Sequence, residues 1–231
     1  MDVVYFLKER TDFIRLYYDR CVVPFAQIKH QIENQLVPFN DPPYSENSEP
    51  PYLTEWMDAD AGIQIVGLSC VSLLSDSLKL YFSSLQHRVI GFEFGDEETK
   101  KKAFKDGFVG AYAGILGYIL ETDWSDCPAD LNVIEQIVLA RNRGQHGGDL
   151  TSFRVSHDQH TLNKYPLPFF ANEDERESWR LDEGTATSSL LMPNVEVTRE
   201  TLFAAIDHVE KLAAWINGRM DKAAEWRMGD R

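Results

Sequence analysis

The chain has 231 residues, enough for one large domain or two small ones with a sizeable hydrophobic core. Its hydrophobic content of 43% and aromatic content of 12% are ordinary for a folded soluble protein. The formal net charge of −14 repels anionic polymers and membrane surfaces on average. The charge therefore argues against a general nucleic-acid coat and confines any nucleic-acid binding to a local basic patch.

Cysteine usage and the length of the apolar runs indicate the compartment. Cys21, Cys70 and Cys127 are odd in number and widely spaced, which predicts reduced thiols without a disulfide framework. Charged residues follow soon after the first residue, so no signal peptide is expected. The longest uncharged runs, residues 62–75 and 107–120, are too short to span a bilayer. We expect a cytoplasmic protein that makes no membrane contact.

The N-terminal part, residues 1–90, is predicted to be helical and resembles no family. Apolar side chains recur at helix-face spacing over the first 37 residues, and Pro24 should kink or break this helix. Four prolines between residues 39 and 51 predict a loop. A second long helix is expected over residues 53–88, with an interruption near Gly62.

A polar helix that begins at residue 97 is expected to pass into a glycine-rich one. Four glycines, at positions 107, 110, 114 and 117, lie on one helical face. Each glycine costs about 1 kcal/mol of helix stability relative to alanine. Their common face predicts close approach of a neighbouring helix within the bundle, or else a subunit interface.

Two further helices are predicted, over residues 130–143 and 199–227. Thr198 is a good cap for the last helix, and its apolar stripe consists of Leu202, Ile206, Val209, Ala213 and Ile216. We predict a single all-α domain over residues 1–231, a helical bundle of five or six helices.

Residues 147–197 interrupt the helical pattern between the last two helices. A loop of about 50 residues is unusual inside a compact domain and is often functional. We expect an excursion with one short hairpin, which packs beside residues 141–146 as a covering loop. Its acidic stretch from Glu173 to Glu183 is either a solvated face or a docking site for a basic partner.

Six consecutive residues, Arg141-Asn142-Arg143-Gly144-Gln145-His146, carry the candidate chemistry. Arg141 projects from the edge of its helix's apolar face with no carboxylate three or four positions earlier. Its partner is a carboxylate of another helix, a group of the facing subunit, or a substrate phosphate, which suits the planar guanidinium. Gly144 allows the helix to end in a left-handed turn, so that the imidazole of His146 folds back and can transfer a proton near neutral pH. The alternative is an ordinary basic helix end followed by a loop histidine.

The pattern Arg141-Asn142-x-x-x-His146 resembles the signature of the HEPN superfamily: an arginine, usually a polar residue, and a histidine after four to six intervening residues. The helix that precedes the motif and the long helix that follows it agree with that family, and the likeness covers residues 97–227. Many HEPN proteins are metal-independent RNases that act as dimers, with two motifs meeting across the interface.

The resemblance implies a role for each motif residue. His146 would assist proton transfer as a 2′-hydroxyl attacks the adjacent phosphorus, and Arg141 would stabilise the charge of the transition state. Asn142 would orient the histidine or bind a phosphate oxygen, while Arg143 and Gln145 would contact the substrate. No metal or other cofactor is implied. The products would be a 2′,3′-cyclic phosphate and a 5′-hydroxyl.

The resemblance also implies partners: a homodimer formed through the motif-bearing helices, RNA as substrate and, in a toxin or defence context, an antitoxin or regulatory protein. Some HEPN members have lost catalysis, so a non-catalytic regulatory or protein-interaction module is the alternative.

A second group, His157, Asp158 and His160, has side chains of types that bind metal, and His146 could join it. No helix places these residues on one face, so we expect a solvated loop without metal.

Overall fold

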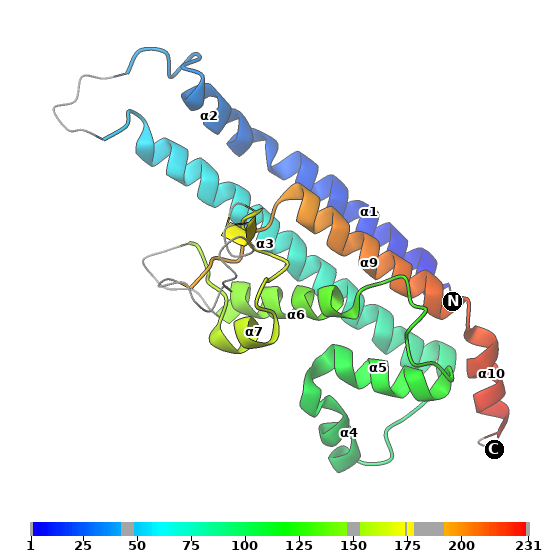
Figure 1. The fold of residues 1–231 in the computed structure, drawn as a ribbon. Helices are drawn as coiled ribbons and strands as arrows, with labels where there is room; N and C mark the ends of the chain where they lie inside the picture. The colour runs from blue at the N-terminus through cyan, green and yellow to red at the C-terminus, as the bar shows by residue number, and fades with distance from the viewer. Residues whose placement is uncertain (1, 43–48, 147–152, 174, 178–191, 230–231) are drawn as a thin grey trace. The chain divides into compact units, whose positions relative to one another are not determined.

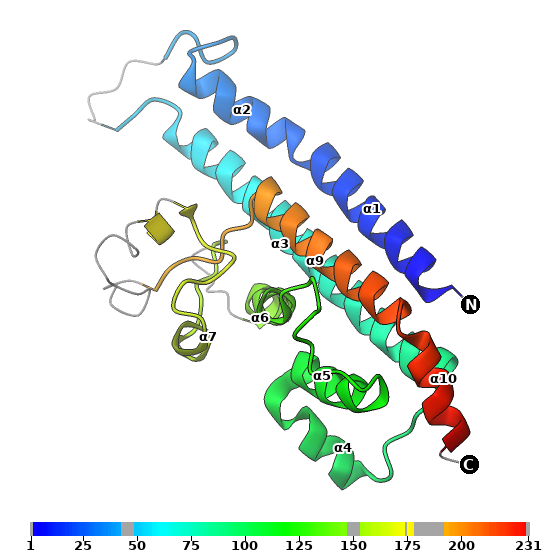
Figure 2. The same ribbon diagram turned by 45° about the vertical axis from the view of Figure 1, so that its right-hand side comes forward.

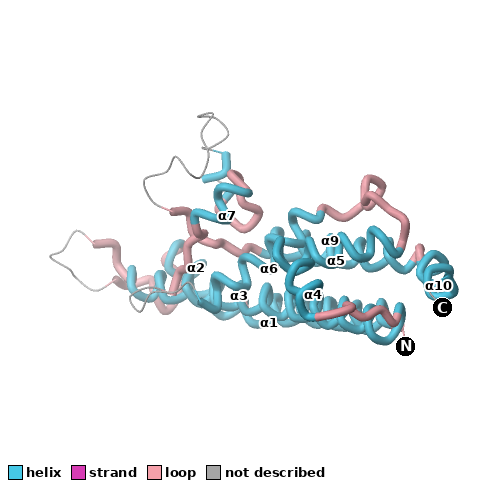
Figure 3. The backbone as a smooth tube through the Cα atoms, turned by 90° about the horizontal axis from the view of Figure 1, so that it is seen from below, coloured by secondary structure: helices cyan, strands magenta, loops and turns pink. Residues whose placement is uncertain are grey.

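The computed structural model describes residues 2–42, 49–146, 153–173, 175–177 and 192–229. Over these residues the protein is all-α, as predicted, and Figure 3 shows helices and loops only. The described part contains nine α-helices, more than the five or six predicted. The chain divides into two compact units: unit 1 comprises residues 1–13, 72–139 and 203–231, and unit 2 comprises residues 14–71 and 140–202.

The first predicted helix is two helices, α1 (Val3–Cys21) and α2 (Val23–Glu33), and the break lies where Pro24 predicts it. Pro24 stands in the first turn of α2, where a backbone N–H would have no acceptor within the helix. Residues 35–42 and 49–52 are non-helical, in agreement with the predicted loop, and residues 43–48 lie outside the described part.

The second long helix, α3 (Leu53–Ser84), runs without a break and continues as one π-helical segment, Leu85–Ile90. The predicted interruption near Gly62 is therefore wrong. A Cβ atom at Gly62 would lie only 2.5 Å from the ring of Phe25, so this glycine permits the close approach of α2 and α3. Figures 1 and 2 both show α2 side by side with the part of α3 that belongs to unit 2.

The glycine-rich region forms α4 (Glu97–Ala103), a short 3-10 turn and α5 (Gly107–Ile119), all in unit 1. A Cβ atom at Gly117 would lie 3.1 Å from both the carbonyl oxygen of Thr122 and the indole nitrogen of Trp124, so close packing explains this glycine. A Cβ atom at Gly114 would meet no atom within 4 Å. Close helix packing is thus the wrong interpretation for Gly114, which is exposed.

The remaining helices are α6 (Leu131–His146), α7 (Gln159–Lys164), α9 (Arg199–Asn217) and α10 (Met220–Gly229). The predicted last helix is two helices because the chain turns at residues 218–219. Thr198 caps α9 as predicted, since its hydroxyl accepts a hydrogen bond of 3.2 Å from the backbone N–H of Thr201. The predicted apolar stripe of α9 is buried throughout.

In unit 1, aromatic and ionic contacts hold the connection between α5 and α6 against the end of α9. The rings of Trp124 and Trp215 stack with centroids 4.9 Å apart. The guanidinium carbon of Arg219 lies 3.7 Å above the Trp215 ring, and the same group donates a hydrogen bond to Asp126. These contacts add to the apolar core formed by α3, α5 and α9.

In unit 2, a mostly buried carboxylate joins α2, α3 and the excursion. Asp60 on α3 accepts a hydrogen bond of 2.6 Å from Lys29 and another from Arg154. Burial opposes ionisation of Asp60, but Lys29 and Arg154 outweigh it and hold its pKa below the ordinary value. This ion pair ties residue 154 to the middle of unit 2.

The two ends of the excursion meet in a single antiparallel bridge between Ser156 and Asn194. The backbone N–H of His157 donates to the carbonyl of Pro193 at 2.9 Å, and that of Val195 donates to Val155 at 2.8 Å. Within the described residues this bridge takes the place of the predicted hairpin. Residues 147–152, 174 and 178–191 lie outside the described part.

Within the described residues one helical stretch, Leu53–Ile90, is long and apolar enough to cross a membrane by length and composition. This stretch is longer than the uncharged runs 62–75 and 107–120 because it also includes charged residues such as Glu55 and Lys79. Half of its most apolar window is buried inside the protein.

Candidate functional site

The Arg141–His146 motif lies wholly within α6, which continues to His146. The predicted helix end at Gly144 is therefore wrong. Glycine adopts helical as well as left-handed backbone conformations, so Gly144 can remain inside the helix. The packing around it does not require a glycine, since a Cβ atom at this position would make only an ordinary contact of 3.5 Å with Leu68. His146 consequently follows the helix and does not fold back toward Arg141.

A continuous helix fixes the directions in which the motif side chains leave it. At 3.6 residues per turn, Arg141 and His146 point about 140° apart around the axis and start about 7.5 Å apart along it. Asn142 and His146 are four positions apart and share one face, on which both are exposed. Gln145 is also exposed and lies one turn after Arg141.

Asn142 lies between Arg141 and His146 in direction around the helix. Arg141 is half-buried, and its Nη1 donates a hydrogen bond of 3.2 Å to Oδ1 of Asn142. A guanidinium, a carboxamide and an imidazole therefore follow one another around the surface of the last turns of α6. This strip can bind phosphate oxygens and exchange a proton, but one copy does not direct Arg141 and His146 to a single point.

Arg143 holds the excursion against the end of α6. Its Nε donates to the carbonyl oxygen of Ser156 at 2.7 Å, and its Nη1 lies 4.0 Å from Oδ2 of Asp158. Asp158 in turn accepts a hydrogen bond of 2.7 Å from the backbone N–H of Thr161 and so caps α7. Burial opposes ionisation of Asp158, but the Thr161 contact and Arg143 lower its pKa overall. These contacts place residues 156–158 of the excursion beside Arg143 of the motif.

His157 is buried, and the predicted solvated loop is wrong for this residue. Its Nε2 donates a hydrogen bond of 2.8 Å to the carbonyl oxygen of Phe170, and burial lowers the pKa of the imidazole. His157 thus serves the packing of the excursion, whereas His160 is exposed. Over the residues that the structure describes, no three or more His, Cys, Asp and Glu side chains form a group able to hold a metal ion.

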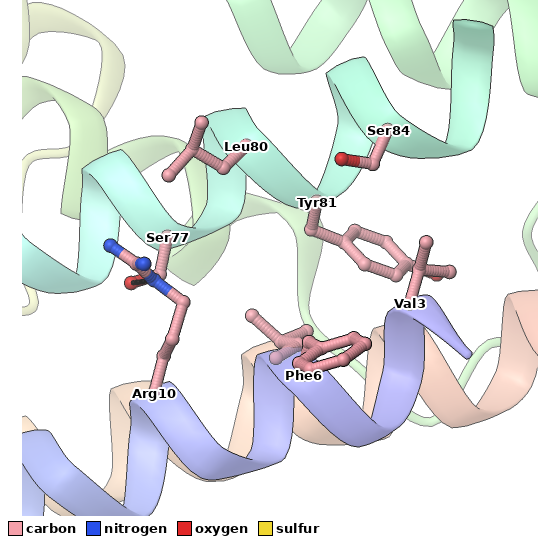
Figure 4. Close-up of a pocket in the computed structure, with 8 residues that line it drawn as sticks. Val3, Phe6, Arg10, Ser77, Leu80, Tyr81 and Ser84 are labelled. Carbon is pink, nitrogen blue, oxygen red and sulfur yellow. Dashed lines mark hydrogen bonds between the residues drawn. The ribbon is translucent and has the colours of Figure 1, made fainter. Parts of the chain in front are cut away.

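The sequence patterns did not identify two cavities of unit 1. One, of about 200 Å³, lies between α1 and α3 and is walled largely by apolar side chains (Figure 4). Figure 4 shows Arg10 directed toward Ser77, to which its Nε donates a hydrogen bond of 2.9 Å. The other, of about 360 Å³, lies where the π-helical end of α3 connects to α4. Its aromatic residues are dispersed along the chain, so no short motif marks it.

No family model matches the chain, and neither the curated proteins nor the solved structures contain a match. The likeness to the HEPN superfamily therefore rests on the motif and its helical setting.

Proposed function

We propose that this chain is a metal-independent endoribonuclease of the HEPN type that acts as a homodimer. The observation that carries the proposal is the polar strip on α6, where Asn142 and His146 are exposed on one face and Arg141 donates its hydrogen bond to Asn142. These are the residue types that grip a phosphodiester and move a proton. Asn142 and His146 are exposed to a large substrate, and Arg141 is half-buried beside them.

The reaction needs two copies of the strip. Because Arg141 and His146 diverge by about 140° on one helix, an arginine from one copy and a histidine from the other would complete each site. Pairing two copies also concentrates positive charge in one cleft. This local charge partly offsets the net charge of −14 per chain, which otherwise disfavours RNA.

The chemistry is an internal transfer that consumes no water. His146 accepts the proton of the ribose 2′-hydroxyl as its oxygen bonds to phosphorus, and the bond from phosphorus to the 5′-oxygen breaks. The leaving 5′-oxygen takes up a proton from a solvent water molecule, and the protonated His146 releases its proton to solvent, so the protons balance. Arg141 stabilises the additional negative charge on the phosphate oxygens in the transition state. Asn142 accepts the hydrogen bond of Arg141 and so orients the guanidinium toward the phosphate.

The test is cleavage of a labelled RNA by the purified chain in the presence of a metal chelator. We expect products with 2′,3′-cyclic phosphate and 5′-hydroxyl ends, and none from an RNA with a 2′-deoxy residue at the cleaved position. Arg141→Ala and His146→Ala should each abolish cleavage, whereas His160→Ala, which alters an exposed histidine outside the motif, should not. Cleavage that survives both motif variants would refute the proposal.

Mixing the two inactive variants tests the shared site directly. A heterodimer of Arg141→Ala and His146→Ala retains one intact pair when each site draws its arginine and histidine from different copies, so mixing should restore part of the activity. A site formed within one copy would stay inactive in the mixture.

The second candidate is a non-catalytic regulatory or interaction module. The geometry of Arg143 favours it, because this cation already bonds the Ser156 carbonyl and lies near Asp158 instead of facing outward to substrate. Folded, dimeric protein without any RNase activity across a broad set of RNAs would select this alternative.

A further inference from the structure

The larger cavity of unit 1 has walls of a distinct chemical kind. It measures about 360 Å³, within the range of small-molecule sites, and it lies between the π-helical end of α3, the connection to α4 and the start of α5. Three aromatic rings line it, those of Phe94, Phe104 and Tyr112, together with the carboxylates of Glu93, Asp96 and Glu97.

The three rings are steeply inclined to one another. The centroid of Phe104 lies 5.7 Å from that of Phe94 at an interplanar angle of 57°, and 5.9 Å from that of Tyr112 at 90°. The rings therefore contact one another at steep angles, and all three line the same cavity. A cavity wall of inclined rings suits a compact, rounded group. A flat heterocycle would instead stack best between aromatic rings that are parallel to it.

A buried hydrogen-bond network holds the ring of Tyr112 in place and occupies its hydroxyl group. Tyr112 donates a hydrogen bond of 2.8 Å to Oε1 of Gln86, whose Nε2 donates to the carbonyl oxygen of Phe92 at 3.3 Å. Burial raises the pKa of Tyr112, so the phenol is neutral at physiological pH. The hydroxyl of Tyr112 is therefore occupied, and its ring, which lines the cavity, is held by stacking on Phe82 with centroids 4.7 Å apart, so this part of the wall is preorganised.

Negative charge predominates around the rings. Three carboxylates line the cavity against one ammonium, that of Lys100, which lies 3.5 Å from Glu97. Glu93 lies 3.0 Å from Nδ1 of His87, and Asp96 accepts a hydrogen bond of 2.6 Å from the backbone N–H of Thr99. The Thr99 contact lowers the pKa of Asp96 and keeps this carboxylate charged. An anionic ligand would be repelled from the cavity, and a neutral one would gain nothing from the charges.

We propose that this cavity binds a small quaternary or alkylated ammonium ion, with the cationic head against Phe94, Phe104 and Tyr112 and the carboxylates around it. A cation within about 6 Å of an aromatic centroid is attracted by the ring, and several rings with nearby carboxylates add their attractions. The inference goes beyond the RNase proposal, because it uses residues of unit 1 only and the motif of α6 contributes no group to it.

The test is a calorimetric or NMR titration of the full chain with choline and with its neutral carbon isostere, in which a tert-butyl group replaces the trimethylammonium. We expect saturable binding of choline and binding of the isostere weaker by about 10-fold or more. Equal binding of the two, or no saturable binding of choline, would overturn the proposal. A parallel titration with a peptide that carries trimethyllysine compares the two sources of the same trimethylammonium group. It shows whether a small molecule such as choline or a modified protein side chain binds more tightly.

Two variants and one control locate the site. Phe104→Leu keeps an apolar side chain but removes one ring, and Glu93→Gln removes one charge, so each should weaken choline binding by about 3- to 10-fold. Glu98→Gln alters an exposed carboxylate of α4 that does not line the cavity and should leave binding unchanged. Circular dichroism establishes that the variants are folded. Wild-type affinity in a folded Phe104→Leu protein would contradict the aromatic site.

Discussion

Asn142 and His146 lie one helical turn apart on the same exposed face of α6, and Asn142 is also bonded to Arg141. The asparagine is thus placed between the guanidinium and the imidazole, whose directions differ by about 140° on the helix. In the proposed RNase, the loss of Asn142 leaves both reacting groups present but removes the acceptor that orients the guanidinium of Arg141.

Asn142→Ala should therefore lower RNA cleavage by about 100-fold through misplacement of the catalytic groups. The free energy of unfolding should change by less than about 0.5 kcal/mol, because the side chain is exposed. The measurement is single-turnover cleavage together with thermal unfolding. Asn132→Ala, at an exposed position near the start of the same helix, is the matched control and should leave cleavage intact. Unchanged cleavage by the Asn142 variant would remove this residue from the site.

Gly144→Ala tests whether α6 continues through the motif. In a helix, alanine is more stable than glycine, and the added Cβ would make only an ordinary contact with Leu68. We expect the free energy of unfolding to rise by about 0.5–1 kcal/mol, measured by denaturant titration. A decrease of similar size would show that Gly144 adopts the left-handed conformation first predicted from the sequence.

Gly67→Ala should act in the opposite direction. The added Cβ would lie 2.7 Å from Cβ of Val197 and 3.0 Å from the carbonyl oxygen of the same residue, and backbone atoms cannot swing aside. We expect a loss of about 1–3 kcal/mol, the usual cost of overpacking. Gly114→Ala is the control: it adds the same methyl group to a helix where no atom lies within 4 Å, and should be neutral or stabilising.

Asp60→Asn should destabilise unit 2 by about 2 kcal/mol, because Lys29 and Arg154 lose their charged acceptor. The wild-type carboxylate has a lowered pKa in the folded state, so its contribution is fully present above its ordinary pKa of 3.8 and is lost as the pH falls below that value. Unfolding experiments at several pH values should therefore show the two proteins converging in stability under acid. A constant difference down to about pH 2 would contradict the assignment.

Local sequence signals predicted the positions of most helices because they act within a few residues. The periodic apolar stripe of α9, its Thr198 cap and the break before Pro24 all follow from the chain's own spacing. The break at residues 218–219 carries no proline, so periodicity alone extended the last helix too far.

The errors at Gly62 and Gly144 share a physical cause. Whether a glycine ends a helix or lies within it depends on what packs against it, here Phe25 and Leu68 respectively, and these contacts join segments distant in sequence. The same limit hid the bond between Asp60 and Arg154, which are 94 positions apart. The motif residues could be identified from the sequence. The relative directions of their side chains could not be predicted, because these directions depend on where the helix ends.

The bridge between Ser156 and Asn194 closes the excursion at its base, and Arg143 fastens that base to α6. The chain that leaves this point returns to it, so the entropy of closure depends only weakly on what lies between, by about 0.6 kcal/mol for each doubling of length. A change of length inside the excursion that keeps the buried side chains of Leu162 and Phe170 in place should therefore cost little closure entropy and leave its base at Arg143 unmoved.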